Sequence, residues 1–196
     1  TDVSKVGVYR IEPFLKSQGV GRLHYVFISH GDADHINGIQ EMLENQFLGI
    51  SIDTLVLPPE NVWDDALREL ARTALKVGTR AAVIQEGQQV KDGEMLWTCL
   101  APAQNYSGEI GNASSMVLSL EYGEFDMLFT GDVEGGGEEA LTGSGLLKDY
   151  DVLKAAHHGS KNSSIEQFLE VTRPEITLIS AGRDNRYGHP HAEAIK

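Results

Sequence analysis

YVFISHGDADHINGI, residues 25–39, is the stretch that decides the fold. Strand-forming residues lead into a loop that holds two histidines and two aspartates, His30, Asp32, Asp34 and His35. His30 and Asp32 are two residues apart, so an extended backbone points both side chains the same way, while Asp34 and His35 lie at the turn into the next element. Imidazole and carboxylate groups are common ligands of divalent ions. The loop therefore predicts metal binding, and its two pairs suit two neighbouring ions. A capping role for Asp34 explains only one of the four residues.

Apolar strands alternate with amphipathic helices on both sides of this loop. We expect strands over 23–29, 53–57, 81–85, 94–100, 116–122, 125–130, 151–155 and 175–180. We expect helices over 36–46, 63–77, about 136–147, and 164–171. Asn61 is a possible cap of the second helix, and Ser163 has capping-box spacing to Glu166. The strands over 116–122 and 125–130, joined by Gly-Glu, predict a hairpin. The pattern predicts an α/β (α+β) fold with a mixed sheet, or two sheets, flanked by helices.

Three further polar loops each follow a predicted strand, where active-site residues commonly gather. Asp132 ends a Gly-Asp turn, which alone is typical of an ordinary turn but beside the first loop suggests a carboxylate that bridges two metals. His157 and His158 are adjacent, so one can bind metal while the other hydrogen-bonds a substrate oxygen. The last loop carries His189 among arginines and looks suited to an anion.

Several other side chains could contact a substrate. Ser160 and Lys161 follow the histidine pair, and Arg183 and Arg186 lie in the last loop. These hydroxyl and cationic donors suit a phosphate group. Asn112, just before a strand, fits equally well as a weak metal ligand, a donor to substrate or a turn residue.

Composition limits the choice of function. The chain has 196 residues, 41% of them hydrophobic, which suits one compact domain with its own core. The net charge of −13 argues against broad, sequence-blind binding of nucleic acid. Cys99 is the single cysteine, so no internal disulfide can form, and we expect it to be a buried small hydrophobe. The chain does not begin with Met, and we expect it to be a piece of a longer protein.

Five segments in order resemble the metallo-β-lactamase superfamily: SHGDADHINGI, NASSMVLSL, FTGD, LKAAHHGSKNSS and ISAGRDNRYGHPH. More narrowly, the set is similar to the nuclease-like domain of ComEC-type competence proteins. The resemblance runs through most of the chain. It implies a single domain over 1–196 with an αββα sandwich, in which the first strands of the family are missing here, and a centre that binds two divalent metal ions.

The resemblance also implies roles for individual residues. The predicted metal ligands are His30, Asp32, Asp34, His35, Asp132 and, of the histidine pair, His158. The residues assigned to catalysis are Asp34, His157 and His189. Those assigned to substrate binding are Asn112, Ser160, Lys161, Arg183 and Arg186.

Two positions depart from many members of the superfamily, which have histidine at Asp32 and near Asn112. An oxygen-rich site shifts metal preference toward Mn²⁺ or Mg²⁺, whereas the imidazoles still suit Zn²⁺. We therefore expect the two ions to be zinc or manganese. ComEC-like members share the aspartate, so Asp32 marks the subfamily.

The function implied is metal-assisted hydrolysis of a phosphodiester, most of all in DNA during competence DNA uptake. A ComEC-type parent would place the domain at the extracytoplasmic face of the membrane, next to membrane segments of the same protein. One alternative is a hydrolase of a small phosphodiester, such as a phosphocholine ester, or of another ester, because fold does not fix function. The other is a non-catalytic metal-binding domain.

Overall fold

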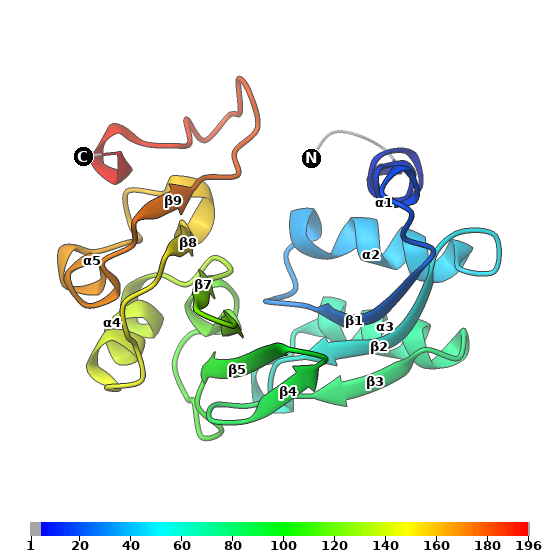
Figure 1. Cartoon of the computed structure of the whole chain (residues 1–196), viewed down its shortest axis with the longest axis horizontal. Coiled ribbons are helices and arrows are strands. Elements are labelled where there is room, and N and C mark those ends of the chain that lie inside the picture. The colour runs from blue at the N-terminus through cyan, green and yellow to red at the C-terminus, as the bar shows by residue number, and fades with distance from the viewer. Residues whose placement is uncertain (1–4, 196) are drawn as a thin grey trace. The chain divides into compact units, whose positions relative to one another are not determined.

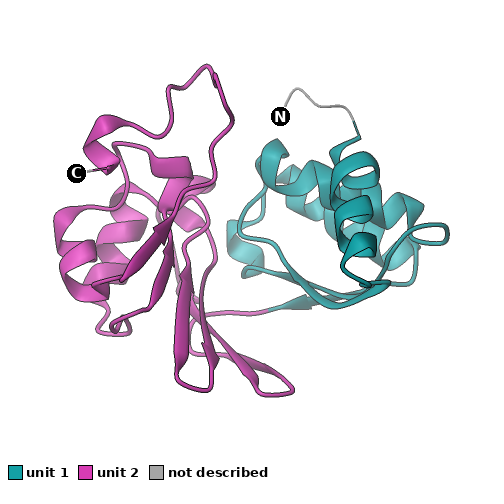
Figure 2. Ribbon diagram, turned by 45° about the horizontal axis from the view of Figure 1, so that its top comes forward, with its two compact units in different colours: residues 1–83 teal, residues 84–196 magenta. Residues whose placement is uncertain are grey.

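The computed structural model describes residues 5–195, and the chain divides into two compact units, residues 1–83 and 84–196 (Figure 2). Each unit contains one sheet, and each has a hydrophobic core of its own. The two are described in turn.

The first unit is a small parallel α/β unit (Figure 1). A turn of π-helix, Gly7–Ile11, leads into α1. The elements that follow are α1 (Glu12–Ser17), β1 (Arg22–Phe27), α2 (Ala33–Asn45), β2 (Ser51–Leu57), a 3₁₀ turn (Glu60–Val62), α3 (Asp65–Lys76) and β3 (Arg80–Val83). The strands are parallel in the order β1-β2-β3, with Val26 paired to Leu55 and Leu55 to Ala81.

The central strand β2 lies in the core of this unit. Its last residues, Leu55, Val56 and Leu57, are all buried, as expected for a parallel strand that is covered on both faces. The apolar stripe of α3 includes Leu67 and Leu70, which belong to the same core as β2. This core fixes the carboxyl ends of the strands, from which the first polar loop leaves.

The second unit is built on a six-stranded mixed sheet in the order β4-β5-β6-β7-β8-β9. Its elements are β4 (Gln89–Asp92), β5 (Met95–Ala101), β6 (Val117–Tyr122), β7 (Phe125–Phe129), α4 (Gly135–Gly143), β8 (Val152–Lys154), α5 (Glu166–Thr172) and β9 (Ile176–Leu178). Strands β4 to β7 are antiparallel, whereas β7, β8 and β9 run parallel. The predicted hairpin is confirmed, with Leu118 of β6 opposite Phe129 of β7.

Helices α4 and α5 pack on this sheet. Leu141 of α4 and Phe168 of α5 belong to one buried cluster with Leu128 of β7 and Leu153 of β8. Cys99 of β5 is fully buried, as predicted, and burial raises the pKa of its thiol to about 12.

Every predicted strand and helix is present among residues 5–195, with ends displaced by up to four residues. Two short elements, α1 and β4, were not predicted. Both predicted caps are wrong: Asn61 lies in the 3₁₀ turn while Asp64 caps α3, and α5 begins after Ile165 without a side-chain cap from Ser163. Across 5–195, no helix has the length and apolar character that a membrane crossing requires.

Candidate metal centre

The loop after β1 places two histidine rings against each other. The backbone N–H of Ile28 still donates to the Val56 carbonyl of β2, 2.9 Å away, so the loop leaves directly from the sheet. The ring centroids of His30 and His35 are 4.3 Å apart, and Ser29 Oγ lies 3.0 Å from Nδ1 of His30 and 3.4 Å from Nδ1 of His35. Because one hydroxyl contacts both Nδ1 atoms, the ring edges that carry Nε2 are the ones suited to a metal ion.

The two aspartates of this loop have different positions on α2. Asp32 is the N-cap residue, but its carboxylate makes no capping hydrogen bond and instead lies 3.6 Å from His30 Nε2. The expected His30–Asp32 pair is therefore present. Asp34 lies in the first turn of the helix, which begins at Ala33, so the suggested capping role of Asp34 is wrong. A carboxylate oxygen of Asp34 and a ring nitrogen of His35 lie within 4.8 Å of each other.

The glycine inside the HGDADH motif is required by a close approach. A Cβ atom at Gly31 would lie 2.6 Å from Cγ of Asp64. Asp64 in turn accepts a hydrogen bond from the Leu67 N–H, 2.8 Å away, and caps α3. The ligand loop is thus packed against the beginning of a second helix of its own unit.

Asp132 lies where β7 ends in the second unit, and it is 3% exposed. Its backbone N–H donates to Ser115 Oγ at 3.1 Å. Lys154 Nζ donates to the Gly131 carbonyl at 2.6 Å and lies 3.4 Å from Asp132 Oδ1. These contacts hold a buried carboxylate in one orientation.

His158 faces Asp132 with a defined tautomer. Its Nδ1 lies 2.7 Å from the Ser180 carbonyl, which can only accept, so Nδ1 carries a proton. Its Nε2 lies 3.3 Å from Asp132 Oδ2, and this hydrogen bond raises the pKa of His158. In the neutral ring, the Nε2 lone pair and the carboxylate oxygen would repel each other unless a cation lay between them. A metal-binding histidine usually donates its other ring N–H to a carbonyl or a carboxylate, as Nδ1 of His158 does here. His158 and Asp132 therefore fit a divalent ion.

His157 turns to a different carboxylate, which the sequence analysis did not identify. His157 Nδ1 lies 2.8 Å from Oε2 of Glu134. The backbone makes this divergence possible, because His157 and His158 have φ angles of 44° and 55°, a conformation that residues other than glycine rarely adopt. Glu134 stands two residues after Asp132, the same spacing as His30 and Asp32, and this spacing is the signal in the sequence that marks it.

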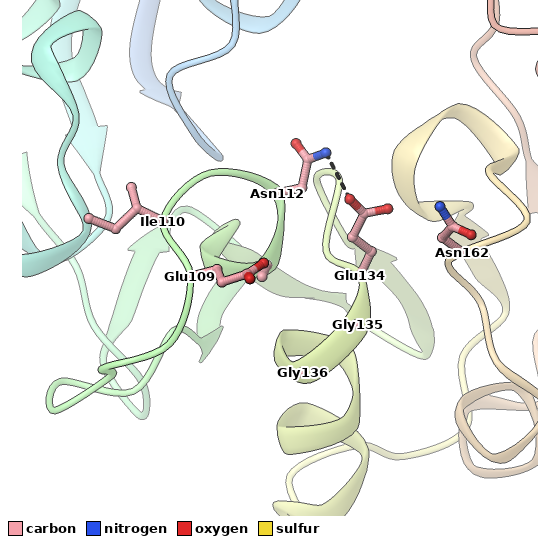
Figure 3. A pocket seen from close by; sticks show the side chains of 8 residues that line it. Glu109, Ile110, Asn112, Glu134, Gly135, Gly136 and Asn162 are labelled. Atoms are coloured by element: carbon pink, nitrogen blue, oxygen red, sulfur yellow. Dashed lines mark hydrogen bonds between the residues drawn. The ribbon is translucent and has the colours of Figure 1, made fainter.

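Asn112 braces the same carboxylate. Its Nδ2 donates to Glu134 Oε1 at 3.0 Å, as the dashed line in Figure 3 shows. Both residues line a pocket of about 350 Å³ at the start of α4, together with Glu109, Ile110, Ala113, Gly135, Gly136 and Asn162. Two carboxylates and no cation line this pocket, so its chemistry suits a hydrogen-bond donor better than a phosphate.

The last loop brings His189 beside the histidine pair. Its ring centroid lies 5.3 Å from that of His157 and 6.2 Å from that of His158. Asn185 holds the loop through bonds to the backbone N–H and carbonyl of His189, 3.0 and 2.6 Å long. Partial burial, and then the neighbouring histidines, lower the pKa of His189.

The predicted phosphate-binding residues have different surroundings. Lys161 and Arg183 are exposed. Arg186 is exposed too, and its guanidinium donates to the Tyr187 hydroxyl at 2.6 Å. Ser160 is 2% exposed, and its Oγ accepts from the Asn162 N–H at 3.2 Å, so this hydroxyl serves the turn. Its assignment to substrate binding remains a prediction.

The structure therefore contains two clusters of potential ligands. The HGDADH cluster is His30, Asp32, Asp34 and His35 of the first unit. The Asp132 cluster is Asp132, Glu134, His157, His158 and His189 of the second unit.

A family model described as a β-lactamase superfamily domain matches residues 6–154, which is most of the chain. The chain belongs to the β-lactamase superfamily. Solved proteins of the same fold include CmlA, a diiron β-hydroxylase from Streptomyces venezuelae, with a TM-score of 0.52. The match covers 80% of this chain and 35% of the CmlA chain, at 12% sequence identity. The α/β fold class predicted from the sequence is confirmed.

Two relatives confirm the narrower resemblance to a ComEC-like competence protein. ComE operon protein 3 of Bacillus subtilis is 30% identical to this chain, over 94% of the chain and 23% of the length of the relative. Competence protein ComA of Neisseria gonorrhoeae is 31% identical over 95% of this chain and 24% of its own. The chain thus spans about a quarter of the length of these relatives.

Proposed function

We propose that this chain is a metal-dependent phosphodiesterase that cuts DNA as one domain of a competence protein. The observation that carries the proposal is the Asp132–His158 pair, with Nδ1 of His158 fixed by the Ser180 carbonyl, in a superfamily domain whose relatives include a competence protein. The superfamily is generally hydrolytic, and a polymer taken up during competence is DNA.

The proposed metal ligands are six side chains from the two clusters: His30, Asp32, Asp34, His35, Asp132 and His158. They would hold two divalent ions, zinc or manganese, because imidazole suits zinc while the oxygen ligands suit manganese. Bound ions would supply Lewis-acid activation of a water near neutral pH.

The chain's own groups would then bind and orient the phosphodiester. Lys161, Arg183 and Arg186 are cations on exposed loops and can contact phosphate oxygens. His157 is the first proposed donor of a proton to the leaving oxygen. His189, whose ring lies 5.3 Å from that of His157, is the second proposed proton donor, and Asp34 is the carboxylate proposed to assist the water.

We extend the proposal to the longer protein. Because the relatives are about four times as long as this chain, the rest of the parent is proposed to supply membrane segments, which would place this domain at the extracytoplasmic face. The prediction that residues 1–196 form a single domain of that parent belongs to the same proposal.

The test is DNA cleavage by Asp132→Ala and His30→Ala after loading with Mn²⁺ or Zn²⁺. Both substitutions remove a proposed ligand and should lower cleavage of single-stranded DNA by about two orders of magnitude or more. Asp149→Ala and His24→Ala are matched controls, because both side chains are exposed and lie outside the clusters. Cleavage at the wild-type rate by either ligand variant would rule the proposal out.

The net charge of −13 favours a second candidate, a hydrolase of a small phosphodiester, since an acidic surface repels a polymer of phosphates. Bis(p-nitrophenyl) phosphate, a phosphocholine ester and single-stranded DNA, assayed side by side, separate the two functions. Less than one equivalent of metal retained after reloading would instead indicate a non-catalytic domain.

A further inference from the structure

Glu134 joins two other side chains of the second unit, those of Asn112 and His157, and the proposed function gives it no role. Its Oε2 lies 2.8 Å from His157 Nδ1 and its Oε1 accepts from Asn112 Nδ2 at 3.0 Å. Both carboxylate oxygens are therefore engaged in directed contacts, and about three quarters of the side chain is withdrawn from solvent. Because Asn112 holds one oxygen of the Glu134 carboxylate, the other oxygen can hold the His157 ring in a fixed direction.

The contact fixes the protonation pattern of the His157 ring. An ionised carboxylate only accepts hydrogen bonds, so Nδ1 of His157 must be the donor. The ring is then oriented with its Nε2 edge away from Glu134. Asn112 cannot replace Glu134 here, because its Nδ2 is itself a donor and lies 3.5 Å from the same Nδ1.

The Glu134–His157 pair differs from the weak ion pairs that are common on protein surfaces, because both side chains are only 24% exposed. Exposed pairs are usually weak because long side chains must lose entropy to form them. Here His157 is held by a backbone with φ of 44°, and Glu134 precedes the first residue of α4 in an extended conformation. The strained position of His157 serves to direct its ring, which is typical of functional sites.

We infer that Glu134 is a positioning residue, which orients His157 so that its Nε2 acts on the leaving oxygen of the phosphodiester. This inference rests on the proposed function. As the oxygen of the attacking water bonds to phosphorus and the P–O bond to the leaving group breaks, the leaving oxygen takes a proton through Nε2 of the ring that Glu134 holds in place, and the ring regains that proton from solvent. The attacking water releases one proton to solvent, so protons balance over a turnover.

Two substrates with different leaving groups test this role. The leaving group of a dinucleotide phosphodiester is an alkoxide, which needs a proton. The leaving group of bis(p-nitrophenyl) phosphate is a stable phenolate, which does not. Glu134→Gln should lower kcat on the dinucleotide by about 10–100-fold, with KM and bound metal unchanged, because a misdirected ring loses much of its proton-transfer contribution. The loss on the nitrophenyl ester should be much smaller.

Further variants separate positioning from folding. His157→Ala should show the same substrate dependence, and the double variant Glu134→Gln/His157→Ala should lose no more than His157→Ala alone. Glu134→Asp keeps the carboxylate and should recover part of the kcat. If Glu134→Gln unfolds at the assay temperature, Glu134→Asp replaces it in the two-substrate test. Glu139→Gln, on the exposed side of α4, is the control for charge and should match wild type.

The outcomes distinguish this inference from the proposed function. If wild type hydrolyses neither substrate, the proposed function is overturned and the inference with it. If wild type hydrolyses both and Glu134→Gln changes neither rate, or lowers both equally, or loses metal, the inference alone is overturned. Additive losses in the double variant would overturn it as well.

Discussion

Gly31 is the residue that allows the HGDADH cluster to lie against the start of α3. A Cβ atom there would meet the Asp64 carboxylate, whose Oδ1 accepts the Leu67 N–H. We predict that Gly31→Ala displaces this cap and lowers the free energy of unfolding by about 1–2 kcal/mol, the usual cost of losing an N-cap. Chemical denaturation of the metal-free protein measures the effect.

The control for this substitution is Gly21→Ala, because no atom lies within 4 Å of a Cβ built at Gly21. Adding Asp64→Ala to Gly31→Ala should cost little more, since the cap is already lost. If Gly31→Ala is as stable as Gly21→Ala, the close approach of Asp64 is not the reason why residue 31 is a glycine.

Single residues of the site were predictable where a local rule applied. The i, i+2 spacing of His30 and Asp32 correctly predicted that their side chains meet. The residues alone did not distinguish His157 from His158, and only the family resemblance favoured His158 as the ligand, because their difference arises from two left-handed backbone conformations. Only the folded chain shows that His158 turns to Asp132 and His157 to Glu134.

At the level of elements, the helices were predictable and their caps were not. The apolar stripe of α3 was sufficient to place it, but the predicted cap, Asn61, lies in a 3₁₀ turn and Asp64 caps the helix instead. α5 has no side-chain capping bond, and the chain just before it is held by Glu138 of α4, whose carboxylate accepts the Ser164 N–H at 2.6 Å. A residue 26 positions away in sequence cannot be found by a local rule.

Glu138 also makes the α4–α5 pair sensitive to pH. Burial raises the pKa of Glu138 from 4.5 to about 7, even though bonds from Ser164 and Ile165 act to lower it. The folded state therefore holds a proton that the unfolded state releases between pH 4.5 and about 7. Its contribution to stability is fully present below pH 4.5 and is lost as pH rises through about 7, by on the order of 2–3 kcal/mol in total.

Glu138→Gln should remove this pH dependence, since an amide stays neutral and its oxygen can still accept the Ser164 N–H. Denaturation of the metal-free protein over this pH range measures the difference between variant and wild type, which cancels the titration of other groups. Glu139→Gln should leave the profile unchanged. A difference that is constant with pH would mean that Glu138 is ionised throughout.

The fold class of the whole chain was predictable, because the sequence of every long helix and strand follows a clear hydrophobic periodicity. Two elements were not predicted: β4 is four residues long and lies at a sheet edge, and α1 is six residues long. Neither is long enough for its pattern to emerge. The division into two units was not predicted, because each core, one around Leu55 and the other around Leu128, depends on contacts between distant segments.

The net charge of −13 leads to a prediction for the molecule as a whole. A DNA-binding enzyme with a cationic surface loses affinity as salt is added, because binding releases counterions. An acidic chain repels DNA, and salt screens that repulsion within about 10 Å at 0.1 M. We therefore predict that kcat/KM for single-stranded DNA rises as NaCl increases from about 0.01 to about 0.1 M.

The control substrate for this prediction is bis(p-nitrophenyl) phosphate, which carries one charge and should show little salt dependence under the same conditions. The local cations Lys161, Arg183 and Arg186 act in the opposite direction, but they are three against an excess of thirteen negative charges. Their attraction should prevail only above the salt concentration at which the acidic surface is screened. A kcat/KM for DNA that falls steadily with salt from the lowest concentration would show that these three cations dominate the approach of DNA, and that the net charge has no part in selecting the substrate.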